Sequence, residues 1–162
     1  MSGAIDRFTQ AAHAAGLTPD VRRFPEGTKT AQDAATAIGV QVGQIVKSLI
    51  FMGEDPRGDR PVLALTSGAN RVNEAVLAGL VGVERLRRAT PEEARTATGF
   101  AVGGTPPFGH PGPLTAFCDE DLLGYDEIWA AAGTPDAVFA LTPAELLRVS
   151  GAEVARFRAD VS

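Results

Sequence analysis

Lys47 interrupts a nearly continuous apolar run, GQIVKSLIF at 43–51. If this run is a strand, its side chains alternate between two faces, and Lys47 and Ser48 lie on opposite faces. Both faces are otherwise apolar, as in a strand that is covered on both sides. A buried ammonium ion costs free energy unless it is paired or reaches water. Lys47 therefore either meets a ligand in a cleft or extends its amine to solvent near the strand end.

The basic residues are strongly biased, with thirteen arginines and only two lysines, Lys29 and Lys47. Arginine keeps its charge near neutral pH and carries a bulky planar group, whereas lysine is compact and its pKa moves readily on burial. A lysine at position 47 thus indicates a requirement for its chemistry or its size. A lysine that simply reaches water explains the same pattern equally well, so both interpretations stay open at this point.

A second candidate feature is the glycine- and proline-rich segment GFAVGGTPPFGHPGP at 99–113. Glycines let backbone N–H groups approach a ligand, and prolines stiffen the loop. Such a loop can hold a carbonyl, carboxylate or phosphate group. Taken alone, it is more often a structural loop with tight turns. His110 belongs to this segment, where its ring could face a cleft.

Other catalytic patterns are missing from the sequence. It contains neither a phosphate-binding GxxxxGK[ST] loop, nor a dinucleotide-binding GxGxxG motif between a strand and a helix, nor a GxSxG nucleophile motif. A single cysteine, Cys118, excludes an internal disulfide and a CxxC metal site, and two histidines far apart in the sequence argue against a zinc site. Cys118 follows an apolar run and is expected to pack in the core. Asp119 either orients a substrate amine or caps a turn.

The chain length and the net charge limit the kinds of partner that the protein can bind. The 162 residues fit one domain, spanning 1–162, and the net charge of −5 excludes an overall basic field for gripping long nucleic acid such as DNA. Clustered arginines at 22–23 and 85–95 could touch phosphates locally, although surface arginines are usually only solvated. No apolar run approaches the ~20 residues of a membrane span. The first residues show no signal-peptide pattern, so we expect a cytoplasmic protein.

The elements that must position these residues mix hairpins with helices, which favours a single α+β domain over a doubly wound parallel sheet. Two expected helices begin with a capping box, at Thr90 and at Thr142. The first helix ends at Gly99 and the second at Gly151. The other expected helices are 5–15, 30–38 and 72–80. The expected strands are 21–24, 46–52, 61–67, 83–86, 114–118, 127–131, 137–141 and 153–158.

Three segments in this order are similar to a known family: TAQDAATAIG at 30–39, QIVKSLIF at 44–51 and TGFAVGGTPPFGH at 98–110, followed by a strand that ends at Asp119. Over nearly its whole length the chain resembles the YbaK/EbsC family, free-standing relatives of the editing domain inserted in bacterial prolyl-tRNA synthetases. The resemblance implies a compact, mixed and mostly antiparallel, barrel-like sheet surrounded by helices. It implies hydrolysis of the ester of mischarged aminoacyl-tRNA without a metal or organic cofactor.

The resemblance also implies roles for particular residues. Lys47 matches the family's lysine, and Gly103 and Gly104 match its glycine loop, so these three are the expected catalytic groups. The expected partners are the acceptor end of aminoacyl-tRNA and an aminoacyl-tRNA synthetase. The remaining positions expected to contact substrate are Thr30, Ser48, Thr105, Pro107, His110 and Asp119.

Two departures from the family bear on the substrate. Ser48 stands where relatives that edit alanine tend to carry asparagine, and 110–113 lacks the glutamine and basic residues typical of relatives that act on cysteinyl-tRNA. A small or medium amino acid remains the expectation. Two other functions stay open: a non-catalytic module of the same fold that binds a small ligand or a regulatory partner, and an enzyme that forms a Schiff base through Lys47.

Overall fold

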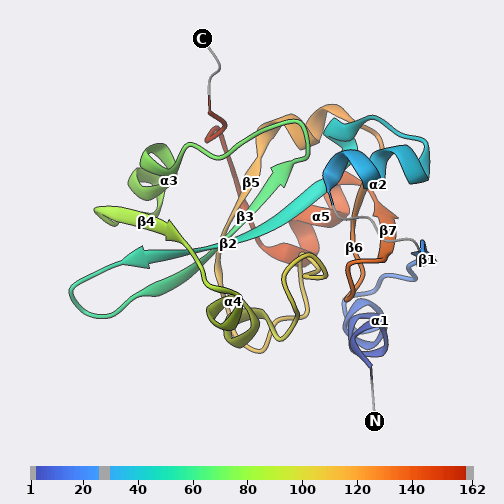
Figure 1. Cartoon of the computed structure of the whole chain (residues 1–162), viewed down its shortest axis with the longest axis horizontal. Helices are drawn as coiled ribbons and strands as arrows, with labels where there is room; N and C mark the ends of the chain where they lie inside the picture. The colour runs from blue at the N-terminus through green and yellow to red at the C-terminus, as the bar shows by residue number, and fades with distance from the viewer. Residues whose placement is uncertain (1–2, 26–29, 160–162) are drawn as a thin grey trace.

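The structure is a computed structural model that describes residues 3–25 and 30–159. Figure 1 shows its helices arranged around two sheets. The helices are α1 (Ala4–Ala14), α2 (Ala31–Ile38), α3 (Glu74–Val81), α4 (Pro91–Thr98) and α5 (Pro143–Ser150), with short 3-10 helices η1 (Val42–Gln44) and η2 (Glu120–Gly124).

The described strands form a five-stranded sheet in the order β4-β2-β3-β5-β8 and a three-stranded sheet in the order β1-β7-β6. β2 pairs antiparallel with β3 and β4, whereas β3–β5 and β5–β8 are parallel. The smaller sheet is antiparallel throughout. The strands are β1 (Arg22–Arg23), β2 (Val46–Glu54), β3 (Arg60–Ser67), β4 (Arg85–Arg88), β5 (Thr115–Asp119), β6 (Ile128–Ala131), β7 (Ala137–Leu141) and β8 (Glu153–Ala155).

The α+β class and the mostly antiparallel pairing are confirmed, but the single barrel-like sheet is not found. The described strands instead form two sheets, which meet at a parallel bridge between Ile45 and Trp129. The physical reason lies in β4, which is short and pairs with β2 only from Phe51 onward. The first half of β2 therefore keeps an outer edge that β4 does not cover.

Helix ends follow the local signals closely. Thr90 and Glu93 form the expected capping box at α4, and Gly99 ends that helix in the left-handed conformation. α5 repeats this pattern from Thr142 to Gly151. These signals act within a few residues of the chain, which is why the sequence predicts them well.

Elsewhere the boundaries differ from expectation. α3 begins two residues later than predicted because the side chain of Asn73 accepts a hydrogen bond from the backbone N–H of Val76 and caps the helix there. The strand expected at 83–86 is β4 at Arg85–Arg88, and β8 ends at Ala155 rather than at 158. The two 3-10 helices, η1 and η2, are not predicted.

β2 lies between two buried clusters, as its apolar faces predict. Val46 and Ile50 pack on one side with Phe139 and other core residues. Phe51 packs on the other side with Phe157. Within the described residues, no helix is long and apolar enough to cross a membrane.

Candidate active site

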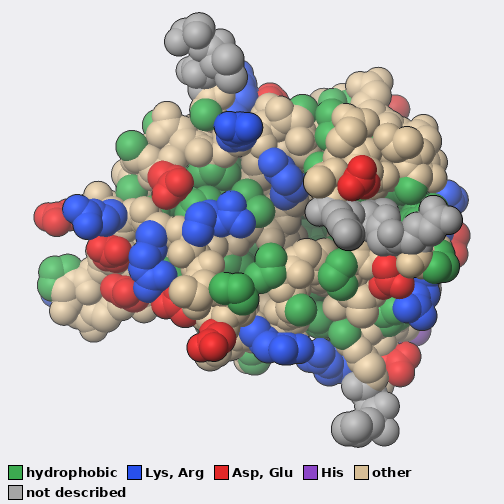
Figure 2. Space-filling model, viewed as in Figure 1, with side chains coloured by type: hydrophobic (Ala, Val, Ile, Leu, Met, Phe, Trp, Pro, Cys, Tyr) green, Lys and Arg blue, Asp and Glu red, His purple; other side chains and the backbone are tan. Residues whose placement is uncertain are grey.

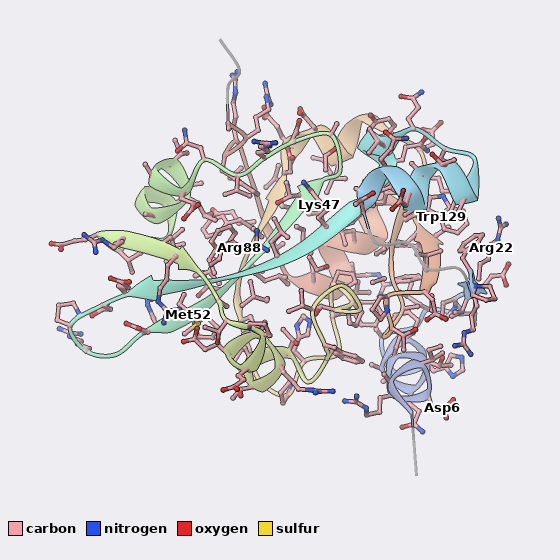
Figure 3. The ribbon with its side chains drawn as sticks, in the orientation of Figure 1. Asp6, Arg22, Lys47, Met52, Arg88 and Trp129 are labelled. Carbon is pink, nitrogen blue, oxygen red and sulfur yellow. The ribbon has the colours of Figure 1, made fainter. Side chains whose placement is uncertain are left out.

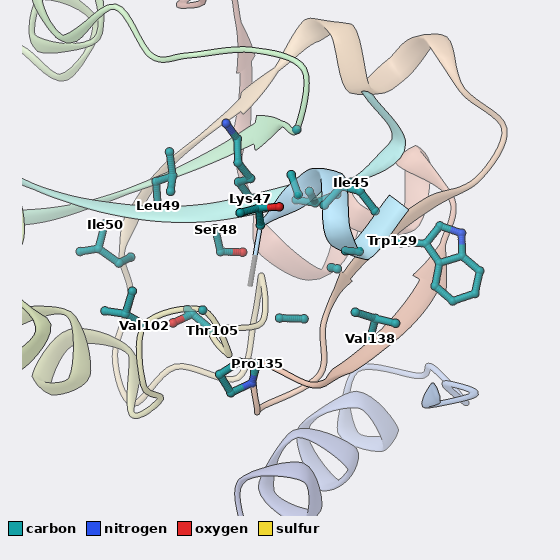
Figure 4. A pocket seen from close by; sticks show the side chains of 18 of the residues that line it. Ile45, Lys47, Ser48, Leu49, Ile50, Val102, Thr105, Trp129, Pro135 and Val138 are labelled. Atoms are coloured by element: carbon teal, nitrogen blue, oxygen red, sulfur yellow. The ribbon is translucent and has the colours of Figure 1, made fainter. Parts of the chain in front are cut away.

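A cavity of about 930 Å³ opens beside the uncovered part of β2 (Figure 4). Its walls come from β2, the start of α2, the glycine-rich loop and β6. Most lining groups are apolar, and Figure 2 shows the hollow on a face where apolar and basic side chains meet. The predicted residues that line it are Thr30, Lys47, Ser48, Gly103 and Thr105.

The backbone of β2 is itself part of this wall. Ile50 O accepts a hydrogen bond from Ala89 N at 3.0 Å on the outer side, whereas Ile45 O accepts one from Gly68 N at 2.7 Å on the inner side. Because strand residues direct their N–H and C=O groups alternately to the two edges, Ser48 directs both groups to the outer edge, like Ile50. β4 does not reach this position, so these backbone groups of Ser48 face the cavity.

Lys47 lies partly buried opposite Thr66 of β3. Its Nζ donates a hydrogen bond of 2.6 Å to the carbonyl oxygen of Asn70. Burial lowers the pKa of Lys47, and the nearby charges of Arg88 and Arg71 lower this pKa further, against the raising effect of Asp119. The amine is therefore not simply extended into water: it has a fixed carbonyl partner and sits among other cations.

The Asn70 carbonyl is held in place by two carboxylates. The side-chain amide of Asn70 donates to Asp119 Oδ2 and to Asp121 Oδ2, each at 2.8 Å. Ser67 N also donates to Asp119 Oδ2 at 3.1 Å. Asp119 is only 1% exposed and does not line the cavity. The structure therefore places Asp119 behind the segment that positions Lys47, not where it would orient a substrate amine.

Ser48 leaves β2 in the direction opposite to Lys47, toward Thr105 (Figure 4). Its Oγ is buried and has no hydrogen-bond partner among the described residues. Thr105 is also buried, and its Oγ1 donates to Ala101 O at 3.2 Å. An unpaired buried hydroxyl is uncommon in folded proteins and is often explained by a ligand or a water molecule.

The two glycines of the loop have different roles. Gly103 lines the cavity with a φ of +89°, a conformation that disfavours other residues. Gly104 does not line it: its N–H donates to Ala101 O and its carbonyl accepts from Gly133 N, both at 3.0 Å. The expected use of the Gly104 amide to polarise a substrate is therefore not supported, because this N–H is already bonded. In the described structure no backbone acceptor takes the N–H of Gly103.

Pro107 and His110 lie away from this site, beside a separate cavity of about 190 Å³. Nε2 of His110 is 2.9 Å from the carbonyl oxygen of Pro106, and burial lowers the pKa of the imidazole. The second cavity is also lined by Leu63 of β3 and Ala116 of β5. Sequence proximity to Gly103 does not bring Pro107 and His110 to the substrate cavity.

Thr30 contributes to both structure and cavity. Its Oγ1 accepts a hydrogen bond of 3.0 Å from Asp33 N and so caps α2, as the sequence predicts. Cys118 is fully buried, and burial raises the pKa of its thiol to about 12, which keeps the thiol protonated. No group of three or more possible metal-binding side chains occurs in residues 3–25 and 30–159.

Sequence reasoning did not identify three residues at or near this site: Asn70, Arg71 and Trp129. It named Arg88 only within a group of arginines that could touch phosphates. Arg88 lines the cavity, and its guanidinium carbon lies 5.5 Å from the centre of the Phe51 ring. Arg88 and Arg87 are neighbours on β4, so their side chains leave the strand on opposite sides. Its neighbour Arg87 pairs with Glu93 at 2.7 Å on the other side. Nothing local in the sequence marks Asn70 or Trp129.

Comparison of the sequence with known proteins finds a matching family model and similar proteins. The family model described as an aminoacyl-tRNA editing domain matches residues 25–149. The chain is 31% identical over 135 residues to the uncharacterized protein YwhH of Bacillus subtilis (strain 168), covering 83% of each chain. It is 35% identical over 98 residues to a proline–tRNA ligase of Nitratidesulfovibrio vulgaris (strain DP4), where the match spans 60% of this chain and 16% of the ligase.

Solved structures agree with these sequence matches. A crystal structure reported as "a putative trans-editing enzyme for prolyl tRNA synthetase" superposes with a TM-score of 0.89 and 50% sequence identity, covering 99% of both chains. The two chains therefore share their fold over essentially their whole length.

Proposed function

Because the chain belongs to the aminoacyl-tRNA editing domain family, we propose that it is a trans-acting editing hydrolase. It cleaves the ester that joins a small or medium amino acid to the terminal ribose of a mischarged tRNA. The proposed domain spans 1–162 and works without a cofactor. The observation that carries this proposal is the cavity of about 930 Å³, whose lining combines apolar side chains around Ser48 with the cations Lys47 and Arg88.

The reaction places modest demands on the protein, since an aminoacyl ester is already activated. Water adds to the carbonyl carbon, the bond to the ribose oxygen breaks, and the proton released by water ends on that ribose oxygen. What the site must supply is position and stabilisation of the negative charge that develops on the carbonyl oxygen. We assign the second task to two backbone N–H groups. One belongs to Ser48, and the other to Gly103, which lines the cavity and whose N–H has no backbone acceptor among the described residues.

The attack is assigned to water because the described part of the cavity offers no side-chain nucleophile with a base beside it. Ser48 has a hydroxyl there, but its Oγ has no hydrogen-bond partner that could accept its proton. The buried thiol of Cys118 and the ring of His110 lie outside this cavity. Direct hydrolysis therefore fits the residues better than a covalent intermediate.

Lys47 is proposed to hold the nucleotide end of the substrate. Its amine leaves β2 on the face opposite to Ser48, so it is better placed to meet the terminal nucleotide than the ester carbonyl (Figure 4). Its bond to Asn70 O fixes where that charge sits. The apolar chamber, with Val102, Pro135 and Val138 among its walls, is left for the aminoacyl side chain.

The test is deacylation of purified alanyl-, cysteinyl-, seryl- and prolyl-tRNA by the wild type and by Lys47→Ala, each checked for an unchanged fold. We expect cleavage of at least one ester and a loss of about a hundredfold or more in kcat/KM in the variant, the size of a missing charge-assisted contact to substrate.

The alternative is a non-catalytic module of this fold that binds a small ligand or a regulatory partner. It predicts that none of the esters is cleaved even at high protein concentration, while an active deacylase in a parallel reaction cleaves them. A synthetase that supplies most of the tRNA affinity is the proposed further partner. Adding prolyl-tRNA synthetase to the same assay would then raise kcat/KM for the weakly bound esters.

A further inference from the structure

We propose that Arg71 and Arg88, together with Lys47, form a binding site for the last phosphodiester groups of the tRNA acceptor end. The proposal rests on the proposed function, because it names how that substrate is held at the mouth of the cavity. It adds two residues that belong to neither the lysine strand nor the glycine-rich loop. The ligand class is the phosphodiester of a single-stranded RNA end.

The first argument is that three cations converge without a free counterion. Arg88 lines the cavity together with Lys47, and Arg71 directly follows Asn70, whose carbonyl oxygen accepts the hydrogen bond from Lys47 Nζ. The positive charges of both arginines lower the pKa of Lys47, and Asp119 is the carboxylate that raises it. Asp119 already accepts hydrogen bonds from Ser67 N and from the Asn70 side chain. No described carboxylate forms an ion pair with Arg71 or Arg88. Like charges brought together repel, and a bound anion would relieve that repulsion.

The second argument is that neighbouring arginines are paired. Arg87 binds Glu93 at 2.7 Å and also pairs with Glu54 and Asp59. Arg158 pairs with Asp121 at 3.1 Å. The chain therefore has carboxylates available on these surfaces, yet none is placed against the cavity-lining Arg88. This protein carries a net charge of −5, so a cationic mouth is a local exception to its overall charge.

The third argument is geometric. Arg88 lines the cavity from the end of β4, and Figure 3 places it beside β2 on the same open face as Lys47. Figure 2 shows basic side chains gathered near the centre of this face. Arginine recognises phosphate through paired N–H donors, and Phe51 under the Arg88 guanidinium supports that group without consuming its outward donors.

The fourth argument is size. A cavity of about 930 Å³ lies near the top of the usual ~300–1,000 Å³ range for ligand pockets, and a small amino acid would fill only a part of it. The remaining space is suited to the terminal nucleoside. The phosphates that follow would then emerge at the mouth, where the three cations are.

The experiment compares two substrates that share the ester but differ in phosphate. The first is the aminoacyl-tRNA that the wild type cleaves best, and the second is the matching aminoacyl-adenosine, which has ribose and base but no phosphate. Arg71→Gln, Arg88→Gln and the double variant are assayed on both. Arg57→Gln, in the β2–β3 turn and outside the cavity lining, removes the same charge as a matched control.

We expect each single variant to lower kcat/KM for aminoacyl-tRNA about tenfold while hydrolysis of aminoacyl-adenosine stays within about twofold of wild type. Binding of uncharged tRNA, followed by fluorescence anisotropy of a labelled RNA, should lose about one unit of salt slope for each arginine removed. Arg57→Gln should resemble the wild type in both assays.

Two results would overturn the phosphate site: losses equal to those of Arg57→Gln, or losses of the same size on both substrates. Failure of the proposed function looks different, because the wild type would then bind uncharged tRNA but cleave neither ester. In that case the anisotropy measurement with the two arginine variants still decides for or against the phosphate site. If the wild type binds no tRNA even at low salt, the site is rejected.

Discussion

At the residue scale, Lys47 shows how one position can be both predicted and misread. The sequence identifies it as unusual because an ammonium ion in an apolar strand needs a partner. The structure supplies an unexpected partner, the carbonyl of Asn70, rather than a carboxylate. That contact depends on the segment after β3, which Asp119 and Asp121 hold through the Asn70 side chain. No local pattern in the sequence encodes such a contact, because it joins three distant parts of the chain.

The lowered pKa of Lys47 leads to a prediction about pH. Phosphate binding needs the protonated amine, and protonation is lost as pH rises through the pKa. That pKa lies below the ordinary 10.5. The affinity for uncharged tRNA should therefore begin to fall at a lower pH than it would if Lys47 were an exposed lysine. The measurement is fluorescence anisotropy between pH 7 and 10 at constant salt.

Lys47→Arg is the control for this pH dependence, since arginine keeps its charge over the whole range. In the variant, the fall in tRNA affinity that is caused by deprotonation of Lys47 should disappear. Any fall in affinity that is caused by titration of the RNA should remain. Equal declines in wild type and Lys47→Arg would contradict the assignment.

At the element scale, the glycine-rich loop combines features set by local sequence with features set by tertiary contacts. The capping boxes of α4 and α5 and the glycine stops are local, so they were predicted correctly. The path of the loop after Thr105 is not local. It follows Phe108, whose ring packs against Phe8 of α1 and Phe139 of β7, and Pro107 and His110 line another cavity. Residue types in the loop were therefore informative, but their directions were not.

Gly103 and Gly104 should respond differently to an added methyl group. A Cβ on Gly104 would lie 2.7 Å from Thr134 Cα and 2.8 Å from Gly133 O, so backbone must move. We expect Gly104→Ala to cost about 3 kcal/mol of stability, at the upper end for overpacking, and to displace the loop. A Cβ on Gly103 would make only an ordinary contact with Pro135 at 3.6 Å, but Gly103→Ala keeps a positive φ, which costs about 1–2 kcal/mol.

Urea unfolding of both variants tests this order, with Gly112→Ala as a control because a Cβ there has nothing within 4 Å and its φ is not in the left-handed region. If Gly103→Ala were the more damaging of the two, the close packing of Gly104 against the β6–β7 connection would be ruled out as the main constraint.

At the scale of the whole molecule, the cavity lies where the two sheets meet, because both residues of their bridge, Ile45 and Trp129, line it. The sequence predicted the strands but not this division, since pairing between distant strands is decided by length and register. Trp129, one partner of the bridge, is the only tryptophan in the chain and lines the cavity. The guanidinium carbon of Arg22 lies 4.9 Å from the centre of the Trp129 ring. Trp129 therefore lies where the smaller sheet, β2 and the cavity come together.

This placement predicts an intrinsic optical signal. Trp129 is only 4% exposed, so its emission should lie at short wavelength in the folded protein and move to longer wavelength on unfolding. A non-hydrolysable amide analogue of aminoacyl-adenosine should change the emission intensity with saturation. Saturating binding detected by calorimetry without any change in emission would show that the ligand does not occupy the part of the cavity beside β6.

The scarcity of lysine has a practical consequence for chemistry at the cavity mouth. With two lysines in 162 residues, and one of them held at Asn70 with a depressed pKa, the protein offers very few primary amines to an electrophile. The dialdehyde formed by periodate oxidation of a tRNA 3′ end is such an electrophile, and an amine with a lowered pKa is more often in its reactive, neutral form. The molecule is thus naturally suited to site-selective affinity labelling, with thirteen arginines providing charge that the reagent does not consume.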